Sequence, residues 1–138
     1  MTMILMKDEI DMLGEIVQKE LLDAGADHVI IVDLAGNLIL DRGKLDTGDI
    51  MSLAVLSAAN FAATSQIARL IGEADFTLMF HKGDKRNIHF NKLGQDYIII
   101  TLFDDGVSLG LIRLKSTKAI EQLKTILDGA EGRHRWPL

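Results

Sequence analysis

The sequence predicts one α/β domain of the α+β kind, in which helices cover both faces of a five-stranded, mostly antiparallel sheet. The 138 residues suit a single domain, and no proline-rich or serine-rich linker divides them. Apolar residues recur at helical spacing in three segments and at strand spacing in five, in the order α-β-β-α-β-β-β-α. Two strands are apolar on both faces, which requires helices on both sides of the sheet. We expect the domain to span residues 1–128 and a short C-terminal tail to span 129–138.

The first elements are a helix and a β-hairpin. Apolar residues at helical spacing predict a helix over residues 7–24, which Gly25 ends. Residues 28–34 are β-branched and apolar on both faces, as is typical of a buried strand. Residues 38–42 return as a second strand after a tight turn, and the Asp33 side chain can accept hydrogen bonds from the amides of that turn.

The second half of the chain predicts a long helix, three strands and a last helix. Asp46 or Thr47 can cap the long helix, and Gly72 ends it. Two of the strands alternate apolar and polar residues, so we expect them toward the sheet edges. Ser108 can cap the last helix, and Gly129 closes it. The expected bounds are 49–71 for the long helix, 76–81, 87–91 and 97–103 for the strands, and 108–127 for the last helix.

Composition excludes several classes of function. The net charge of −5 lacks the basic footprint of a nucleic-acid-binding protein. The absence of cysteine excludes disulfides, thiol catalysis and zinc–thiolate sites, and it fits the reducing cytoplasm. The apolar start of the chain soon gives way to mixed charge, and the most apolar stretch, residues 50–71, holds several polar side chains. We therefore expect neither export nor membrane insertion.

The long second helix is unusual because it is apolar on more than one side. One stripe has the spacing of a core-facing surface: Leu53, Leu56, Asn60, Ala63, Ile67 and Leu70. The far side is small and uncharged until Arg69, where a solvated helix would carry Lys and Glu, and it comprises Met51, Val55, Ala58, Ala59, Ala62, Ser65, Gln66 and Arg69. The helix is either buried on all sides within one domain or packed against a second chain. We favour the second chain, because a protein of this size has too few elements to cover both sides.

Several segments resemble the Roadblock family in order and spacing, over about residues 7–127. Within the family the chain is most similar to bacterial regulators of cell polarity and gliding motility. The matching segments are VDLAGN at 32–37, SLA at 52–54, AANFAA at 58–63, LIGE at 70–73, FHKG at 80–83 and SLGLIRL at 108–114.

The resemblance implies a non-enzymatic homodimer that binds a small Ras-like GTPase. It implies that the dimer is joined through the second helix and the third strand, and that it stimulates GTP hydrolysis without donating a catalytic residue. It implies no catalytic, cofactor-binding or metal-binding residues. The residues expected to face the GTPase are Val55, Ala58, Ala59, Ala62, Ser65, Gln66 and Arg69. Those expected at the dimer interface are Met51, Ala63, Phe76, Leu78 and Phe80. One departure is that Thr64, Ser65 and Gln66 stand where similar chains can carry glycine.

Other chemical readings of the sequence are less well supported. Arg42, Arg69, Arg86 and Arg113 are candidates for an arginine finger, but each is better read as a solvated or ion-paired side chain, and Arg69 as a rim contact. No Gly-rich lysine loop is present, so the chain is not itself the GTPase.

Two further pairs of residues are candidates for metal binding and for acid–base catalysis, but neither is favoured by its position in the sequence. His81 and His89 could lie opposite each other on a hairpin, where a third metal ligand is not evident. Asp104 and Asp105 suit a turn and a helix entry better than acid–base catalysis. The end of the chain, residues 133–138 with Trp136, is either frayed or a docking segment.

Two other functions stay open at this point. The same dimer could be a scaffold or effector that binds a GTPase or motor complex without accelerating hydrolysis. Alternatively, the domain could be a sensor that encloses a small molecule, in which case a monomer with a polar pocket is expected.

Overall fold

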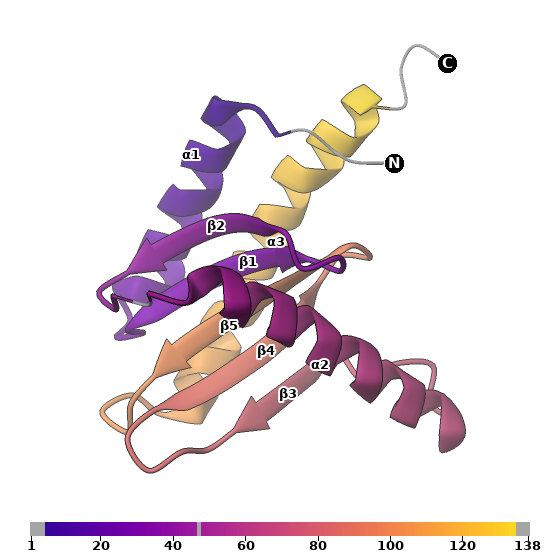
Figure 1. Ribbon diagram of the computed structural model, residues 1–138. Helices are drawn as coiled ribbons and strands as arrows, with labels where there is room; N and C mark the ends of the chain where they lie inside the picture. The colour runs from indigo at the N-terminus through magenta and orange to yellow at the C-terminus, as the bar shows by residue number, and fades with distance from the viewer. Residues whose placement is uncertain (1–4, 47, 135–138) are drawn as a thin grey trace.

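The computed structural model describes residues 5–46 and 48–134 and places three helical segments around one five-stranded sheet (Figure 1). The order of elements agrees with the sequence prediction. The bounds are α1 (Lys7–Val17) with a π-helical turn after it, η1 (Gln18–Leu22), then β1 (His28–Asp33), β2 (Leu38–Gly43), α2 (Ile50–Leu70), β3 (Leu78–His81), β4 (Asn87–Leu93), β5 (Tyr97–Phe103) and α3 (Leu109–His134).

The sheet is antiparallel throughout, with the strand order β2-β1-β5-β4-β3. The two strands that are apolar on both faces, β1 and β5, pair with each other in the interior, with Ile30 opposite Ile100. Every residue of β5 is buried. β2 and the four-residue β3 form the two edges. The prediction that fully apolar strands lie centrally is confirmed, because only such strands can be covered on both sides.

The two faces of the sheet are covered unequally. Helices α1 and α3 lie together on one face, and α2 crosses the other face alone (Figure 1). Side chains alternate between the two faces along β1 and β5, so each strand contributes to two separate cores. Ile31 and Ile99 pack toward α1 and α3, whereas Ile30 and Ile100 pack toward α2. On the α2 side, the large residue that the helix itself buries is Phe61, which is 3% exposed.

Several boundaries differ from the sequence prediction, among them the end of the first helix, which gives way to the π-helical turn η1 at Gln18, and the end of β4, which runs to Leu93. The last helix does not end at Leu127: Gly129 and Gly132 lie inside α3, because Ala130 is fully buried and packing outweighs the poor helix propensity of glycine. β3 begins at Leu78, two residues later than expected. The cap of α2 is Asp49 rather than Asp46. Thr47, the other candidate cap, lies outside the described residues.

Other local predictions agree with the structure. The Ser108 hydroxyl accepts the Leu111 N–H at 3.1 Å at the start of α3, as an N-cap should. The Asp33 carboxylate accepts the backbone N–H groups of Ala35 and Asn37 in the first hairpin turn. Residues 135–138, including Trp136, lie outside the described part of the chain, so both interpretations of the tail stay predictions.

The core beneath α3 contains polar groups without partners. His89 and Thr101 are cross-strand neighbours on β4 and β5, and both are fully buried. Neither ring nitrogen of His89 nor the Thr101 hydroxyl has a hydrogen-bond partner within the described residues, and the same holds for the buried Ser116 hydroxyl on α3. Burial, with a further contribution from the Arg113 guanidinium, lowers the pKa of His89 to about 4. The folded protein therefore holds this imidazole neutral.

The first prediction concerns the pH dependence of stability. An unfolded imidazole takes up a proton at pH about 6.5, whereas folded His89 does so at about 4. The free energy of unfolding should lose about 3 kcal/mol from this group as the pH falls through that window. Urea unfolding at several pH values would measure it in the wild type and in His89→Leu. The variant should lose less stability over the window, and identical losses would remove His89 as the cause.

The second prediction concerns the attachment of α2 to the sheet. Phe61→Ala should lower the free energy of unfolding by about 3 kcal/mol, because it empties the main contact of α2 with the second core. Phe61→Leu keeps an apolar side chain there and should cost about 1 kcal/mol. Hydrogen exchange should show the loss first in the amides of α2. A uniform increase across α1 and α3 would contradict this local role.

Candidate partner-binding site on helix α2

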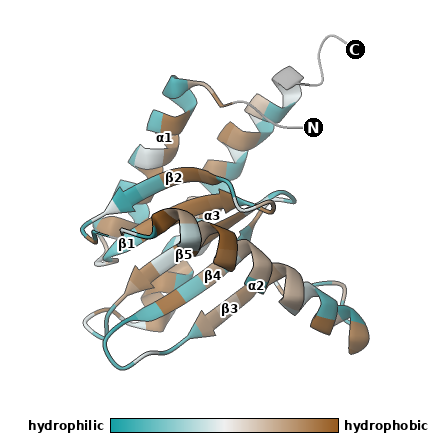
Figure 2. Cartoon of the chain, in the orientation of Figure 1, coloured by the Kyte–Doolittle hydropathy of each residue, from teal (hydrophilic) through white to brown (hydrophobic). Residues whose placement is uncertain are grey.

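Exposed apolar side chains gather on α2. Six of the eleven exposed large apolar side chains among the described residues lie at positions 51–71: Met51, Val55, Leu56, Ile67, Leu70 and Ile71. Figure 2 shows that hydrophilic colour is sparse along this helix until its last turns. An exposed apolar surface of this kind usually marks a contact with another macromolecule.

The core-facing side of α2 differs from the side that the sequence predicted. The helix buries Ala54, Ser57, Ala58, Phe61 and Ala68 against the sheet. The stripe predicted to face the core is instead largely exposed, with Leu56 at 66% and Leu70 at 86%. That prediction was wrong because both sides of the helix are apolar, so periodicity alone could not choose between them. Small residues allow the helix backbone to lie close to the sheet.

The exposed stripe runs along the whole helix. We name Leu56, Ala63, Ile67 and Leu70 the α2 stripe; their spacings of seven, four and three residues place them on one side of a helix. All four are exposed. At 100° per residue, Ala62 and Arg69 lie about 120° around the helix from this stripe, next to the buried Ala58, so the exposed part of α2 offers a second surface that faces another direction.

The second surface contains a groove of about 280 Å³, which we name the α2 groove. Its apolar lining comprises the buried Ala58 and Phe61 at the base and the exposed Leu34 and Ala62, and Ser65, Gln66 and Arg69 line it further along α2. Five of the seven residues predicted to face a GTPase therefore lie together in it: Ala58, Ala62, Ser65, Gln66 and Arg69. The other two, Val55 and Ala59, are exposed nearby on α2, whereas Ala58 is buried at the floor.

The turn between β1 and β2 lies close to α2 beside this groove. A Cβ atom at Gly36 would stand 3.1 Å from the Cα of Val55, and the backbone of Gly36 has a positive φ of 91°. Only glycine adopts this conformation readily and leaves room for the helix. The close approach allows Leu34, just before the turn, to line the groove.

One end of the groove is a polar cluster centred on Asp75. Its carboxylate accepts hydrogen bonds from the Ser65 hydroxyl at 2.9 Å, the Phe76 amide at 2.9 Å and the Lys92 ammonium at 3.0 Å. The Lys92 hydrogen bond, against a smaller opposing effect of burial, lowers the pKa of Asp75. Sequence reasoning missed Leu34, Asp75 and Lys92, since only the fold brings three separate segments together here.

The residues predicted at a dimer interface are not all on one surface. Ala63 belongs to the α2 stripe, and Leu78 is exposed on the edge strand β3. Met51 is exposed about 120° around the helix from Ala63. Phe76 precedes β3, and Phe80 stacks on Phe103 with ring centroids 6.0 Å apart, so its ring is partly used within the protomer.

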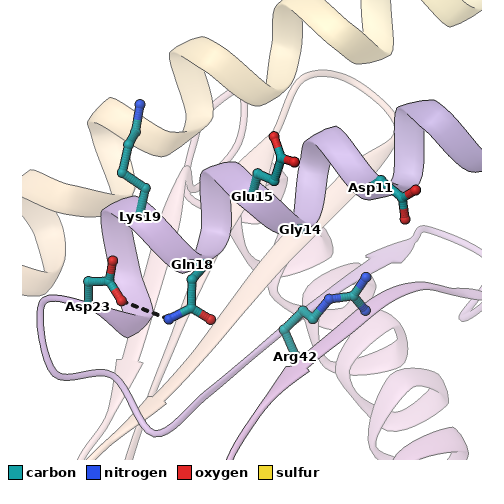
Figure 3. Close-up of a pocket in the computed structure, with 7 residues that line it drawn as sticks. All are labelled: Asp11, Gly14, Glu15, Gln18, Lys19, Asp23 and Arg42. Carbon is teal, nitrogen blue, oxygen red and sulfur yellow. Dashed lines mark hydrogen bonds between the residues drawn. The ribbon is translucent and has the colours of Figure 1, made fainter.

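A second cleft lies on the other face of the molecule, between α1 and β2 (Figure 3). It measures about 490 Å³ and is lined by Asp11, Gly14, Glu15, Gln18, Lys19, Asp23 and Arg42. Arg42 lies against Gly14, where a Cβ atom would stand 3.0 Å from its guanidinium, and it donates a hydrogen bond to the carbonyl oxygen of Asp41. This open, charged cleft has the character of a solvated surface.

The four candidate arginine fingers are spread over the molecule. Arg42 lies in the α1–β2 cleft, and Arg113 lies on α3, which covers the face opposite α2. Arg86, in the turn before β4, stands 4.0 Å from Asp27. Arg69 alone of the four lines the α2 groove.

The idea that two histidines face each other across a hairpin is wrong. The register pairs His81 with Ile88 and His89 with Phe80, so the two imidazoles point to opposite faces of the sheet. Within residues 5–46 and 48–134 no group of three or more potential metal ligands is found.

The Asp104–Asp105 pair serves the turn before α3. Asp104 accepts the Gly106 N–H at 2.7 Å. Asp105 accepts hydrogen bonds from the buried Asn87 amide at 2.9 Å and from Lys82, and so joins this turn to the β3–β4 turn. Both side chains are thus used in local structure.

Comparison with known proteins confirms the resemblance seen in the sequence motifs. The profile of the Roadblock/LC7 domain matches residues 12–103. Myxococcus xanthus MglB is 34% identical, with a TM-score of 0.85, over 92% of this chain and 96% of that one. The gliding protein MglB from Thermus thermophilus is 26% identical, with a TM-score of 0.85, over 93% and 97%. An MglB in a tetrameric arrangement is 26% identical, with a TM-score of 0.87, over 94% and 97%. No curated protein sequence matches the chain.

Proposed function

Because this chain belongs to the Roadblock/LC7 family, we propose that it is a homodimeric regulator that binds a small Ras-like GTPase of the MglA type. We propose further that it stimulates GTP hydrolysis without donating a catalytic residue. The observation that carries the proposal is the exposed apolar surface of α2, which is divided between the α2 stripe and the α2 groove. Two surfaces on one helix suit two different protein partners.

The α2 stripe and β3 are assigned to the second protomer. β3 is an edge strand, so its outer backbone groups are free to pair with a copy of the same strand. Leu56, Ala63 and Ile67 lie on the side of α2 away from the groove. A small residue such as Ala63 permits the close approach of a second helix. The tetrameric arrangement of one similar MglB supports self-association in this group.

The α2 groove is assigned to the GTPase. A regulator of this kind acts by holding the switch loops of the GTPase in the arrangement competent for hydrolysis. The acceleration is then a population shift, limited by the difference in its affinity for the two arrangements. Such a mechanism needs a shaped surface and no reactive side chain. Arg69 at the groove is expected to orient the partner rather than enter its active site.

Helix α2 is also the one described helix that is long and apolar enough to cross a membrane, by length and composition alone. Its buried line packs on the sheet through Phe61 and Ala54, which uses it as part of a folded domain. Ser52, Asn60 and Arg69 add polar groups that a membrane interior disfavours. We therefore propose that protein partners in the cytoplasm, and not lipid, cover its exposed surfaces.

The third prediction tests the dimer. Ile67→Glu places a charge in the centre of the α2 stripe and should convert the dimer to a monomer, because burying an unpaired carboxylate is costly. Sedimentation equilibrium of the wild type and the variant would measure the mass. Leu114→Glu, at an exposed apolar residue of α3, is the matched control and should remain dimeric. A wild type that sediments as a monomer at high concentration would refute the dimer.

The fourth prediction tests GTPase binding and activation. A Ras-like GTPase from the same organism, loaded with GTP, should bind the wild type and hydrolyse GTP faster in its presence. Ala62→Arg should abolish both effects while leaving circular dichroism unchanged, because this exposed position lines the α2 groove. Ala62→Ser should retain them. Binding without any increase in turnover would reduce the protein to a scaffold, and absence of binding would refute the proposed function.

A further inference from the structure

We propose that the α2 groove recognises the GTPase through one apolar side chain that lies next to an acidic residue, with Arg69 contacting the acid. This inference rests on the proposed function and specifies the chemistry of the segment that the groove accepts. It is carried by three features of the groove: an apolar floor, a surplus of positive charge at its lining, and a position open to the surface of α2.

The floor of the groove accepts an apolar group. Phe61 and Ala58 provide buried apolar surface at its base, and Leu34, which is 47% exposed, forms part of its lining. When an apolar side chain displaces water from such a surface, the free energy of the system falls. The floor contains no unpaired acceptor that would require a polar ligand, because the one carboxylate in the lining, Asp75, already accepts three hydrogen bonds.

The charge of the groove is positive although the protein as a whole carries −5. Lys92 is paired with Asp75, so these two charges cancel. Arg69 has no hydrogen-bond or ion-pair partner among the described residues, and it leaves a net charge of +1 beside the apolar floor. A guanidinium binds a carboxylate through two parallel N–H groups, which makes an aspartate or glutamate its best protein partner.

The shape of the groove favours a side chain of another protein over an enclosed small molecule. Its volume is about 280 Å³. The groove also lies open on the surface of α2, where a segment of another protein can enter while its backbone stays outside. Interface hot spots cluster in well-packed pockets and are enriched in arginine, which agrees with an apolar anchor held beside Arg69.

The Lys92–Asp75 pair has a positioning role in this scheme. It joins β4 to the segment between α2 and β3, and Ser65 ties the same carboxylate to α2. This link holds the wall of the groove in place before a partner arrives, which lowers the cost of ordering it on binding. Arg69, in contrast, should contact the partner directly.

The fifth prediction uses charge reversal with the GTP-loaded Ras-like GTPase as the probe. Arg69→Glu should weaken binding by about tenfold, and Arg69→Gln by less, as expected for the reversal and the removal of one charge at an interface. Binding by the wild type should weaken at high salt, and Arg69→Gln should show a smaller salt dependence. Lys118→Glu, on an exposed position of α3, is the matched control and should bind like the wild type.

The partner residue is then identified by charge exchange. Each exposed Asp or Glu of the GTPase that neighbours an apolar residue is changed to Lys, and one such variant should recover binding to Arg69→Glu. If the wild type binds and Ala62→Arg does not, but Arg69→Glu binds like Lys118→Glu, the acidic anchor is refuted and the proposed function stands. If the wild type itself fails to bind, the proposed function is refuted first. Equal salt dependence of wild type and Arg69→Gln would also overturn the inference.

Discussion

Helix α2 is joined to the sheet along one narrow line of residues, and most other properties of the molecule depend on this constraint. The line is made of alanines, one serine and Phe61, so the helix lies close to the strands but buries few large side chains. The opposite face of the sheet is covered by two helices, α1 and α3, with a larger core. Free energy of folding therefore comes mainly from the α1–α3 side. The α2 side is left with apolar residues that one protomer cannot cover, which makes it the side available for partners.

Because the core is divided unequally, the residues that stabilise the fold differ from the residues proposed to contact a partner. Leu13, Leu21, Ile99 and Leu123 are fully buried or nearly so in the α1–α3 core, far from the groove. Residues that line the groove, such as Ala62 and Gln66, are exposed and contribute little to folding. The surface of α2 can therefore differ between related chains without loss of the fold. In the proposed function, the sheet and the α1–α3 core supply the stability, and the exposed residues of α2 supply the contacts with a partner.

Much of the fold could be predicted from the sequence because it follows from local patterns. Runs of β-branched residues located β1 and β5, and the same runs placed both strands inside the sheet. The Asp33 turn and the Ser108 cap followed from the hydrogen-bonding habits of those side chains. Sequence patterns did not predict the structure where two alternatives had the same chemical character. The helix α2 is apolar on several sides, so its spacing could not show which side meets the sheet, and Ala130 extended α3 through two glycines.

The candidate site was predictable only in part for the same reason. The small, uncharged residues of α2 indicated a partner surface, and five of the seven proposed GTPase-facing residues do line one groove. Their assignment to a GTPase remains a proposal. Asp75, Lys92 and Leu34 carried no sequence signal, because their association depends on how a turn, a connecting segment and a strand meet in space. The register of β3 and β4 likewise separated His81 from His89, although the hairpin itself was predicted.

The shortness of β3 bears on how assembly is limited. A strand of four residues offers few backbone hydrogen-bonding groups to another chain. An isolated protomer is therefore a poor template for amyloid-like stacking. Antiparallel pairing with the identical strand of a second protomer would occupy the β3 edge. This arrangement has two-fold symmetry and gives a closed dimer. The remaining edge, β2, carries Asp41 and Arg42, charges that discourage further sheet extension. A sheet joined across two protomers through β3 would therefore have β2 at both outer edges, and these charged edges would not pair with further chains.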